Sequence, residues 1–136
     1  MNAELKRRRD LLTQQLPELA ADCLLVSSLA NIRYLSGFTG SNALLLVSGE
    51  EITLFTDPRY TIRAKQESDC RTIIAKGPLY EAASKFIRRR KWRRIGVEQG
   101  KITYAAYTDL AKFFPVNSPI TPLPPVVEQQ RMVKSE

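Results

Sequence analysis

Apolar and polar positions form two patterns along this chain, short apolar runs and longer amphipathic segments. The short runs have the length of buried strands and occupy residues 22–28, 42–47, 51–55, 70–75 and 94–98. The amphipathic segments have helical spacing and occupy residues 2–16, 56–68, 79–91 and 103–114. Because strands alternate with helices, the pattern predicts a layered α/β domain.

Turn-forming residues set several of the predicted boundaries. Pro17 ends the first helix, and Ser28 caps a short helix over residues 31–35 that Gly37 ends. A glycine-containing turn at residues 48–50 joins two apolar runs, which is typical of an antiparallel hairpin. The hairpin makes at least one strand pair antiparallel, so we expect a mixed sheet.

The last part of the chain has a different composition. Residues 115–125 hold five of the eight prolines and are expected to be an extended connector. A helical pattern resumes over residues 126–136 and ends without a glycine or proline stop signal. We therefore expect one domain over residues 1–122, and over 123–136 a linker with the start of a helix that leads into a further domain.

Composition places the chain among ordinary globular proteins. Its 136 residues fit one domain, with 43% hydrophobic and 26% charged residues. No apolar run approaches the roughly 20 residues of a membrane helix, and none follows the basic N-terminal cluster as in a secretory signal. We expect a cytoplasmic protein in which Cys23 and Cys70 are free thiols, although the sequence also permits a disulfide.

The chain contains no histidine. This excludes histidine as a general base, as the partner of a serine or cysteine nucleophile, and as a metal ligand within the chain. No CxxC or DxD spacing appears either. A site built only on carboxylates or on a thiolate stays an alternative, but no spacing indicates one, and we predict neither a catalytic group nor a metal site in these residues.

Basic residues give the chain a net charge of +7 and gather in Lys6–Arg9 and Arg88–Arg94. Such a charge permits a basic nucleic-acid-binding domain as an alternative function. However, Trp92 is the only aromatic residue in the second run, which offers no platform for stacking bases. The run also ends a helix, where cations complement the helix dipole, so a solvated or subunit-facing patch is favoured.

Two polar stretches hold the candidate site residues. Asn31, Arg33 and Tyr34 precede a glycine loop; they would contact a substrate cleft or another domain, unless the asparagine only serves its own turn. Asp57, Arg59 and Tyr60 follow a predicted strand and suit the same roles. Alternatively, Asp57 caps a helix, Arg59 lies on the surface and Tyr60 is half-buried. For Glu98, at the end of the RIGV run, a structural role is favoured over catalysis.

Four segments in order resemble the N-terminal, non-catalytic domain of the creatinase/prolidase/aminopeptidase P family. They are NIRYLSGFTGSNALLLV, LFTDPRYTIRAKQE, RIGVEQGKITYAAYTDL and VVEQQRMVKSE, and the likeness covers essentially the whole chain. GFTGS followed by TDxRY is most similar to the Xaa-Pro aminopeptidase and Xaa-Pro dipeptidase branch. The resemblance implies a three-layer α/β/α fold with a mixed, ribonuclease-H-like sheet.

The resemblance also implies a division of labour. A following catalytic domain would carry two divalent metals, Mn²⁺ or Co²⁺, and would cleave short proline-containing peptides. This domain would form one wall of the cleft, restrict access to it and contribute contacts of a homo-oligomer, and Asn31 is the residue best aligned with the family's cleft positions. An assembly domain of a catalytically silent homologue stays an alternative.

Overall fold

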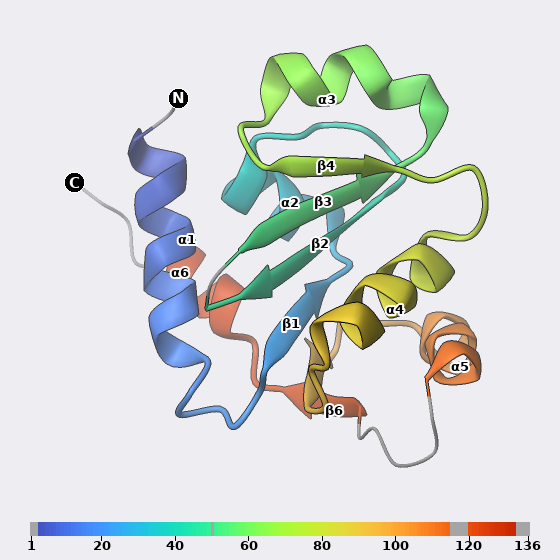
Figure 1. The fold of residues 1–136 in the computed structure, drawn as a ribbon. Coiled ribbons are helices and arrows are strands. Elements are labelled where there is room, and N and C mark those ends of the chain that lie inside the picture. Colours follow the sequence, from blue (N-terminus) through green and yellow to red (C-terminus); the bar gives the residue numbers. More distant parts are fainter. Residues whose placement is uncertain (1–2, 50, 115–119, 133–136) are drawn as a thin grey trace.

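A computed structural model describes residues 3–49, 51–114 and 120–132 (Figure 1). Its centre is a six-stranded sheet in the order β4-β3-β2-β1-β5-β6. The strands are β1 Cys23–Val26, β2 Ala43–Ser48, β3 Ile52–Thr56, β4 Arg71–Ile74, β5 Ile95–Glu98 and β6 Ile120–Leu123. Since β2 pairs antiparallel with both its neighbours and the other pairs are parallel, only β2 is reversed. The predicted mixed sheet is confirmed.

Helices cover both faces of the sheet (Figure 1). They are α1 Ala3–Gln15, α2 Leu29–Ser36, α3 Thr61–Glu67 after a 3-10 turn at Pro58–Tyr60, α4 Leu79–Arg90, α5 Tyr104–Phe113 and α6 Val126–Met132. Side chains from α1, α2, α3 and α6 share one core cluster, and those from α4 and α5 share another across the sheet. The fold is therefore the expected three-layer α/β/α arrangement.

Strand periodicity explains why the central apolar runs are continuous. In β1, Leu24 and Val26 join the core under α1 and α2, whereas Cys23 and Leu25 join the core under α4 and α5. Side chains alternate between the two faces of a strand, and helices cover both faces here. Every residue of β1 and of β2 is consequently buried.

One strand lies where we expected only a connector. β6 pairs parallel with β5, and Pro122 belongs to it. Proline is tolerated in an edge strand because no neighbour needs its missing N–H. The strand is fixed by Leu123, which is buried against Gly96; a Cβ on that glycine would come within 2.4 Å of the Leu123 side chain.

The C-terminal prediction is tested in part. α6 begins at Val126 as predicted, shortly after β6 ends. Residues 115–119 of the predicted connector and residues 133–136 of the predicted last helix lie outside the described residues. Within the described ranges, no helix is long and apolar enough to cross a membrane.

Candidate functional site at the carboxyl edge of the sheet

Polar residues follow the strands at one edge of the sheet. The five co-directional strands end there and β2 begins there, which brings together Ser27, Ser28, Asn42, Asp57 and Glu98. Ligands of open α/β sheets bind outside the carboxyl ends of their strands. The two polar stretches therefore meet at the carboxyl ends of the strands, where proteins of this fold class bind their ligands.

Glu98 is a buried carboxylate with its hydrogen-bonding capacity in use. Its Oε1 accepts from the backbone N–H groups of Ser27 at 2.7 Å and of Ser28 at 2.8 Å. Its Oε2 accepts from Nδ2 of the fully buried Asn31 at 2.5 Å. A buried carboxylate is costly unless it is paired or hydrogen-bonded. Glu98 thus joins the ends of β1 and β5 to α2, which gives it the structural role that the sequence favoured.

The amide of Asn31 also contacts α6. Nδ2 donates to Glu128 Oε2 at 2.9 Å, and Oδ1 accepts from Arg131 Nη1 at 2.8 Å. Lys101 Nζ lies 3.9 Å from the same Glu128 oxygen. The interpretation of Asn31 as a turn residue that serves its own backbone is therefore wrong, because its side chain ties α2 to α6.

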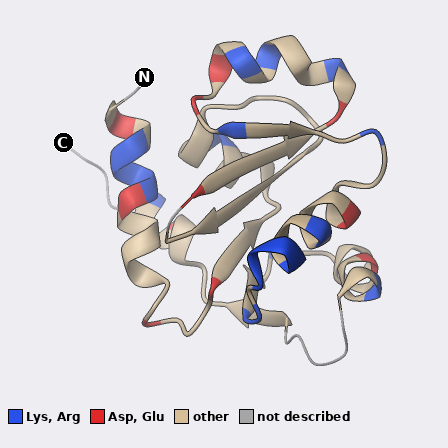
Figure 2. Cartoon of the chain, in the orientation of Figure 1, with Lys and Arg blue, Asp and Glu red and all other residues tan. Residues whose placement is uncertain are grey.

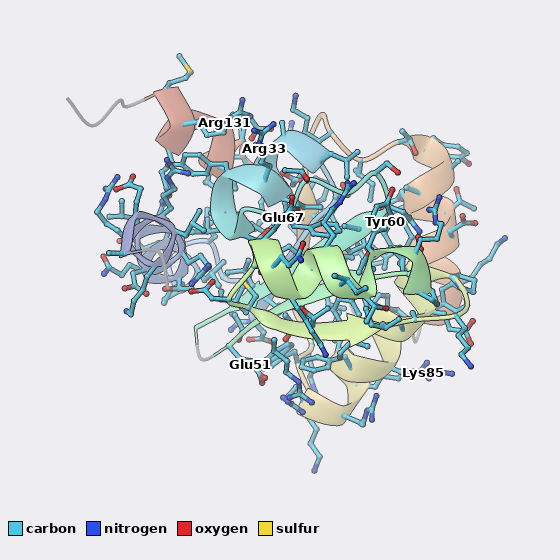
Figure 3. All side chains as sticks on the ribbon, turned by 90° about the horizontal axis from the view of Figure 1, so that it is seen from above. Arg33, Glu51, Tyr60, Glu67, Lys85 and Arg131 are labelled. Carbon is cyan, nitrogen blue, oxygen red and sulfur yellow. The ribbon has the colours of Figure 1, made fainter. Side chains whose placement is uncertain are left out.

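Arg33 and Tyr34 lie on the outer side of α2. Arg33 is exposed, whereas Tyr34 is half-buried with the Arg8 guanidinium 4.4 Å from its ring centre. Gln130 Nε2 of α6 donates to the Tyr34 hydroxyl at 3.3 Å. Arg33 and Tyr34 line a hollow of about 670 Å³ together with Arg8 and Arg131. Figure 3 shows Arg33 and Arg131 on the same side of the molecule.

Asp57 serves as the predicted helix cap. Its Oδ1 accepts from the Arg59 backbone N–H at 3.0 Å, and the exposed Arg59 guanidinium donates to both carboxylate oxygens at 2.9 and 2.8 Å. Asn42 Nδ2 donates to Oδ2 at 2.8 Å. Hydrogen bonds from Arg59 and then from Asn42 hold the pKa of Asp57 well below its usual range. Asp57 is therefore an anion at neutral pH and suits structural or ionic contacts better than proton transfer.

Tyr60 connects the two sequence stretches directly. Its hydroxyl lies 2.6 Å from Ser41 Oγ and accepts from the Ser41 backbone N–H at 3.3 Å. The hydrogen bonds from Ser41 lower the pKa of Tyr60. Phe38 meets the half-buried Tyr60 ring edge-on, with centroids 5.6 Å apart. The glycine loop therefore packs on the Asp57–Tyr60 turn.

A pocket of about 470 Å³ opens on the same edge. Its lining includes Ser27 and Asn42, which neighbour the Glu98 and Asp57 groups, and Tyr80 from α4. Burial raises the pKa of Tyr80. Sequence reasoning missed Tyr80, because nothing in the local pattern of α4 shows that its first turn reaches the end of β1.

The described residues offer neither a metal site nor a reactive thiol. Among them no three His, Cys, Asp or Glu side chains come together in a group that could hold a metal ion. The metals implied by the resemblance therefore do not fit these residues, and we assign them no metal-assisted step. Cys23 and Cys70 are free. Burial raises the pKa of Cys23 to about 12 and also raises that of Cys70, so neither is an activated thiolate at neutral pH.

Part of the Arg88–Arg94 run has structural partners. Arg90 pairs with Glu51 through both carboxylate oxygens, and Arg94 Nη2 lies 2.9 Å from Asp22 Oδ1. Trp92 is half-buried against Phe86, with centroids 6.1 Å apart. The other four basic residues of the run are exposed and make no ion pair within the described ranges: Arg88, Arg89, Lys91 and Arg93. Figure 2 shows basic residues crowded over the end of α4.

Comparison with known proteins settles the family. The family model for the creatinase/prolidase N-terminal domain matches residues 8–133. The chain belongs to this family. A Bacillus subtilis relative, described as the uncharacterized peptidase YqhT, is 32% identical over 133 residues, which is 97% of this chain and 36% of that protein. The creatinase/prolidase N-terminal domain thus spans about a third of this relative.

Solved structures agree with this family. An Xaa-Pro aminopeptidase structure from Streptococcus thermophilus is 31% identical with a TM-score of 0.85, covering 96% of this chain and 100% of that one. The N-terminal domain of cytoplasmic peptidase PepQ from Mycobacterium tuberculosis is 29% identical with a TM-score of 0.84, covering 90% of this chain and 97% of that one. An Xaa-Pro dipeptidase from Bacillus anthracis shares the fold, with a TM-score of 0.89 at 22% identity over 97% of this chain and 37% of its own. The resemblance stated from the sequence is confirmed.

Proposed function

We propose that this chain is the non-catalytic N-terminal domain of a cytoplasmic Xaa-Pro metallopeptidase. The carrying observation is the match of residues 8–133 to the creatinase/prolidase N-terminal domain, in a chain that spans 36% of the Bacillus subtilis peptidase. The catalytic domain of the same polypeptide would hold two divalent metals, Mn²⁺ or Co²⁺, and cleave the bond before proline. The present domain would supply a cleft wall, restrict entry to short peptides and contribute contacts of a homo-oligomer.

The docking of α6 supports this assignment. α6 ends the described part of the chain, and Asn31 holds it through both Glu128 and Arg131. A linker helix that is fixed at its start would set the direction in which a following domain leaves. Asn31 then acts as an interdomain positioning residue and makes no direct contact with substrate.

The exposed candidates suit direct contacts better. Arg33 projects from α2, and Arg59 is exposed beside the Asp57 cap. Tyr34 and Tyr60 are half-buried next to them, so their rings are held in place while part of each stays accessible. We assign Arg33, Tyr34, Arg59 and Tyr60 to the cleft wall or the interdomain surface, and Asp57 to holding Arg59.

The test compares this chain with the full-length gene product on Xaa-Pro peptides in added Mn²⁺. We expect hydrolysis by the longer protein and none by residues 1–136. Hydrolysis by residues 1–136 would refute the non-catalytic role. Activity in neither protein would favour the silent homologue, whose N-terminal domain serves assembly alone.

A further inference from the structure

The outer edge of β4 pairs with no other strand of the described residues. β4 is the last strand of the sheet, and the Ala75 backbone N–H bonds to Thr56 O of β3 at 2.8 Å. In a parallel ladder alternate residues face the partner strand, so Ile73 and Ala75 face β3 while the peptide groups of Thr72 and Ile74 point outward. Figure 3 looks onto this edge, with α3 on one side and α4 on the other.

A groove of about 280 Å³ lies between this edge and α4, and we name it the β4–α4 groove. Its floor is apolar and includes Ile73, Ala75 and Ala82, which are partly buried against the core. Its rim carries the exposed cations Lys76, Lys85 and Arg89. Ile74, whose peptide group points outward from β4, also lines the groove, so an open strand position, an apolar floor and basic side chains lie along the same groove.

Positive charge dominates the rim of the β4–α4 groove. Glu81 is the only carboxylate among the residues that line it, and Glu81 pairs with Lys85 at 3.4 Å. Lys76 and Arg89 make no ion pair in the described part of the chain. Arg88 continues the basic surface along α4. An incoming segment would therefore gain most from carboxylates.

Two other occupants fit less well. A second copy adding its own β4 edge would bring Arg71, Lys85 and Arg89 of both copies together, which like-charge repulsion opposes. Single-stranded nucleic acid needs exposed rings for stacking, but Trp92 beside this surface packs against Phe86.

We propose that the β4–α4 groove binds an extended acidic segment of a partner protein by strand addition. The segment lies along β4 and exchanges backbone hydrogen bonds with Thr72 and Ile74. Its side chains alternate between two faces. Acidic residues at every second position then face α4, where they meet Lys85 and Arg89, and the residues between them face the α3 side of the sheet.

The first experiment uses a labelled eight-residue peptide that alternates valine and glutamate, with a valine–lysine peptide for comparison. We expect saturable binding of the acidic peptide alone, measured by fluorescence anisotropy. We also expect slower hydrogen exchange of the Thr72 and Ile74 amides on binding. Equal binding of both peptides, or binding without protection of these two amides, overturns the proposal.

Substitutions then test the rim. Lys85→Gln and Arg89→Gln should each weaken binding about two- to fivefold, as expected for exposed charge pairs. Lys6→Gln on α1 is the matched control, because Lys6 and Lys85 have equal side-chain exposure of 60% and each pairs with a carboxylate one helical turn away. The control should bind like the wild type. If it weakens binding as much as Lys85→Gln, the attraction reflects net charge and the groove is not the site.

A third variant tests the backbone contact. Ile74→Pro removes the outward N–H, which β3 does not use, and edge strands tolerate proline. We expect binding to weaken about three- to tenfold, the cost of one hydrogen bond.

Sedimentation provides a second measurement. If Lys85→Gln and Arg89→Gln self-associate while the wild type binds no acidic peptide, the charges serve only to keep open edges apart, and the proposal fails.

Discussion

Arg131 Nη1 donates a 2.8 Å hydrogen bond to Asn31 Oδ1 across 100 residues of sequence. The Asn31 amide is fully used, because its two N–H groups face Glu98 and Glu128 while its oxygen accepts from Arg131. One buried side chain thereby joins α2, β5 and α6. This amide holds α6 to the domain together with Gln130 and the buried Val126 and Val127.

Replacing Asn31 by alanine should lower the free energy of unfolding by about 2–3 kcal/mol. The change leaves Glu98 Oε2 without its Asn31 donor and removes the acceptor of Arg131. A buried polar group that loses its hydrogen-bond partner destabilises the fold by its desolvation free energy. Urea denaturation followed by circular dichroism measures the change.

Asn42→Ala is the matched control for this prediction. Asn42 also donates from Nδ2 to a carboxylate, that of Asp57, but Asn42 is exposed. Its removal should cost less than about 1 kcal/mol, because water replaces the lost partner. Equal losses in the two variants would show that burial of the Asn31 group contributes nothing.

Arg9 gives the protein an acid-sensitive contact. The Arg9 guanidinium is buried, donates to Leu35 O at 3.2 Å and lies 2.9 Å from Asp69 Oδ1. Its hydrogen bonds hold the pKa of Asp69 below the ordinary 3.8. A carboxyl group whose pKa is lower in the folded than in the unfolded state stabilises the fold at pH values above the unfolded-state pKa. This contribution is lost as the pH falls through the folded-state pKa. Below pH 4, wild-type stability should therefore fall more steeply than that of Arg9→Met.

Denaturant titrations between pH 7 and pH 2 measure this difference. At pH 7 Arg9→Met should be about 2 kcal/mol less stable, since it removes the partner of Asp69 and the buried hydrogen bond to Leu35 O. Lys6→Met, which breaks the exposed pair with Asp10, should change stability by less than about 1 kcal/mol. Parallel pH profiles for wild type and Arg9→Met would contradict a role for the Asp69 pair.

Gly37 is a position where only glycine fits. It has φ of 83°, and a Cβ there would lie 2.7 Å from Glu67 O and 3.2 Å from Leu5 Cδ1. Gly37→Ala should lower stability by at least about 1–2 kcal/mol, since alanine strains this backbone conformation as well as clashing. Gly49→Ala should be close to neutral, because no described atom beyond the adjacent residues lies within 4 Å of a Cβ there. Thermal unfolding compares the two, and a Gly37→Ala protein as stable as Gly49→Ala would contradict the strain.

Local chemistry made most elements predictable. The capping roles predicted for Ser28 and Asp57 are realised by side-chain hydrogen bonds to the backbone N–H groups of Asn31 and Arg59. A helix cap and the N–H group that it binds lie two or three residues apart, so the sequence shows both partners directly. β6 was missed for the same reason, since Pro122 discourages a strand locally and only its edge position permits one.

The sequence by itself determined the layered α/β class and the mixed sheet, because periodicity and turn residues specify which faces are buried. The family was indicated by the resemblance of four segments to known N-terminal domains. Only the tertiary structure showed that Asn31 bonds to Glu98, Glu128 and Arg131, and that Arg9, inside a basic run, is buried and pairs with Asp69. Those contacts depend on strand order and helix placement. A residue's own neighbours do not encode which distant side chain will face it, so the partners appear only once the sheet has brought its strand ends to a common edge.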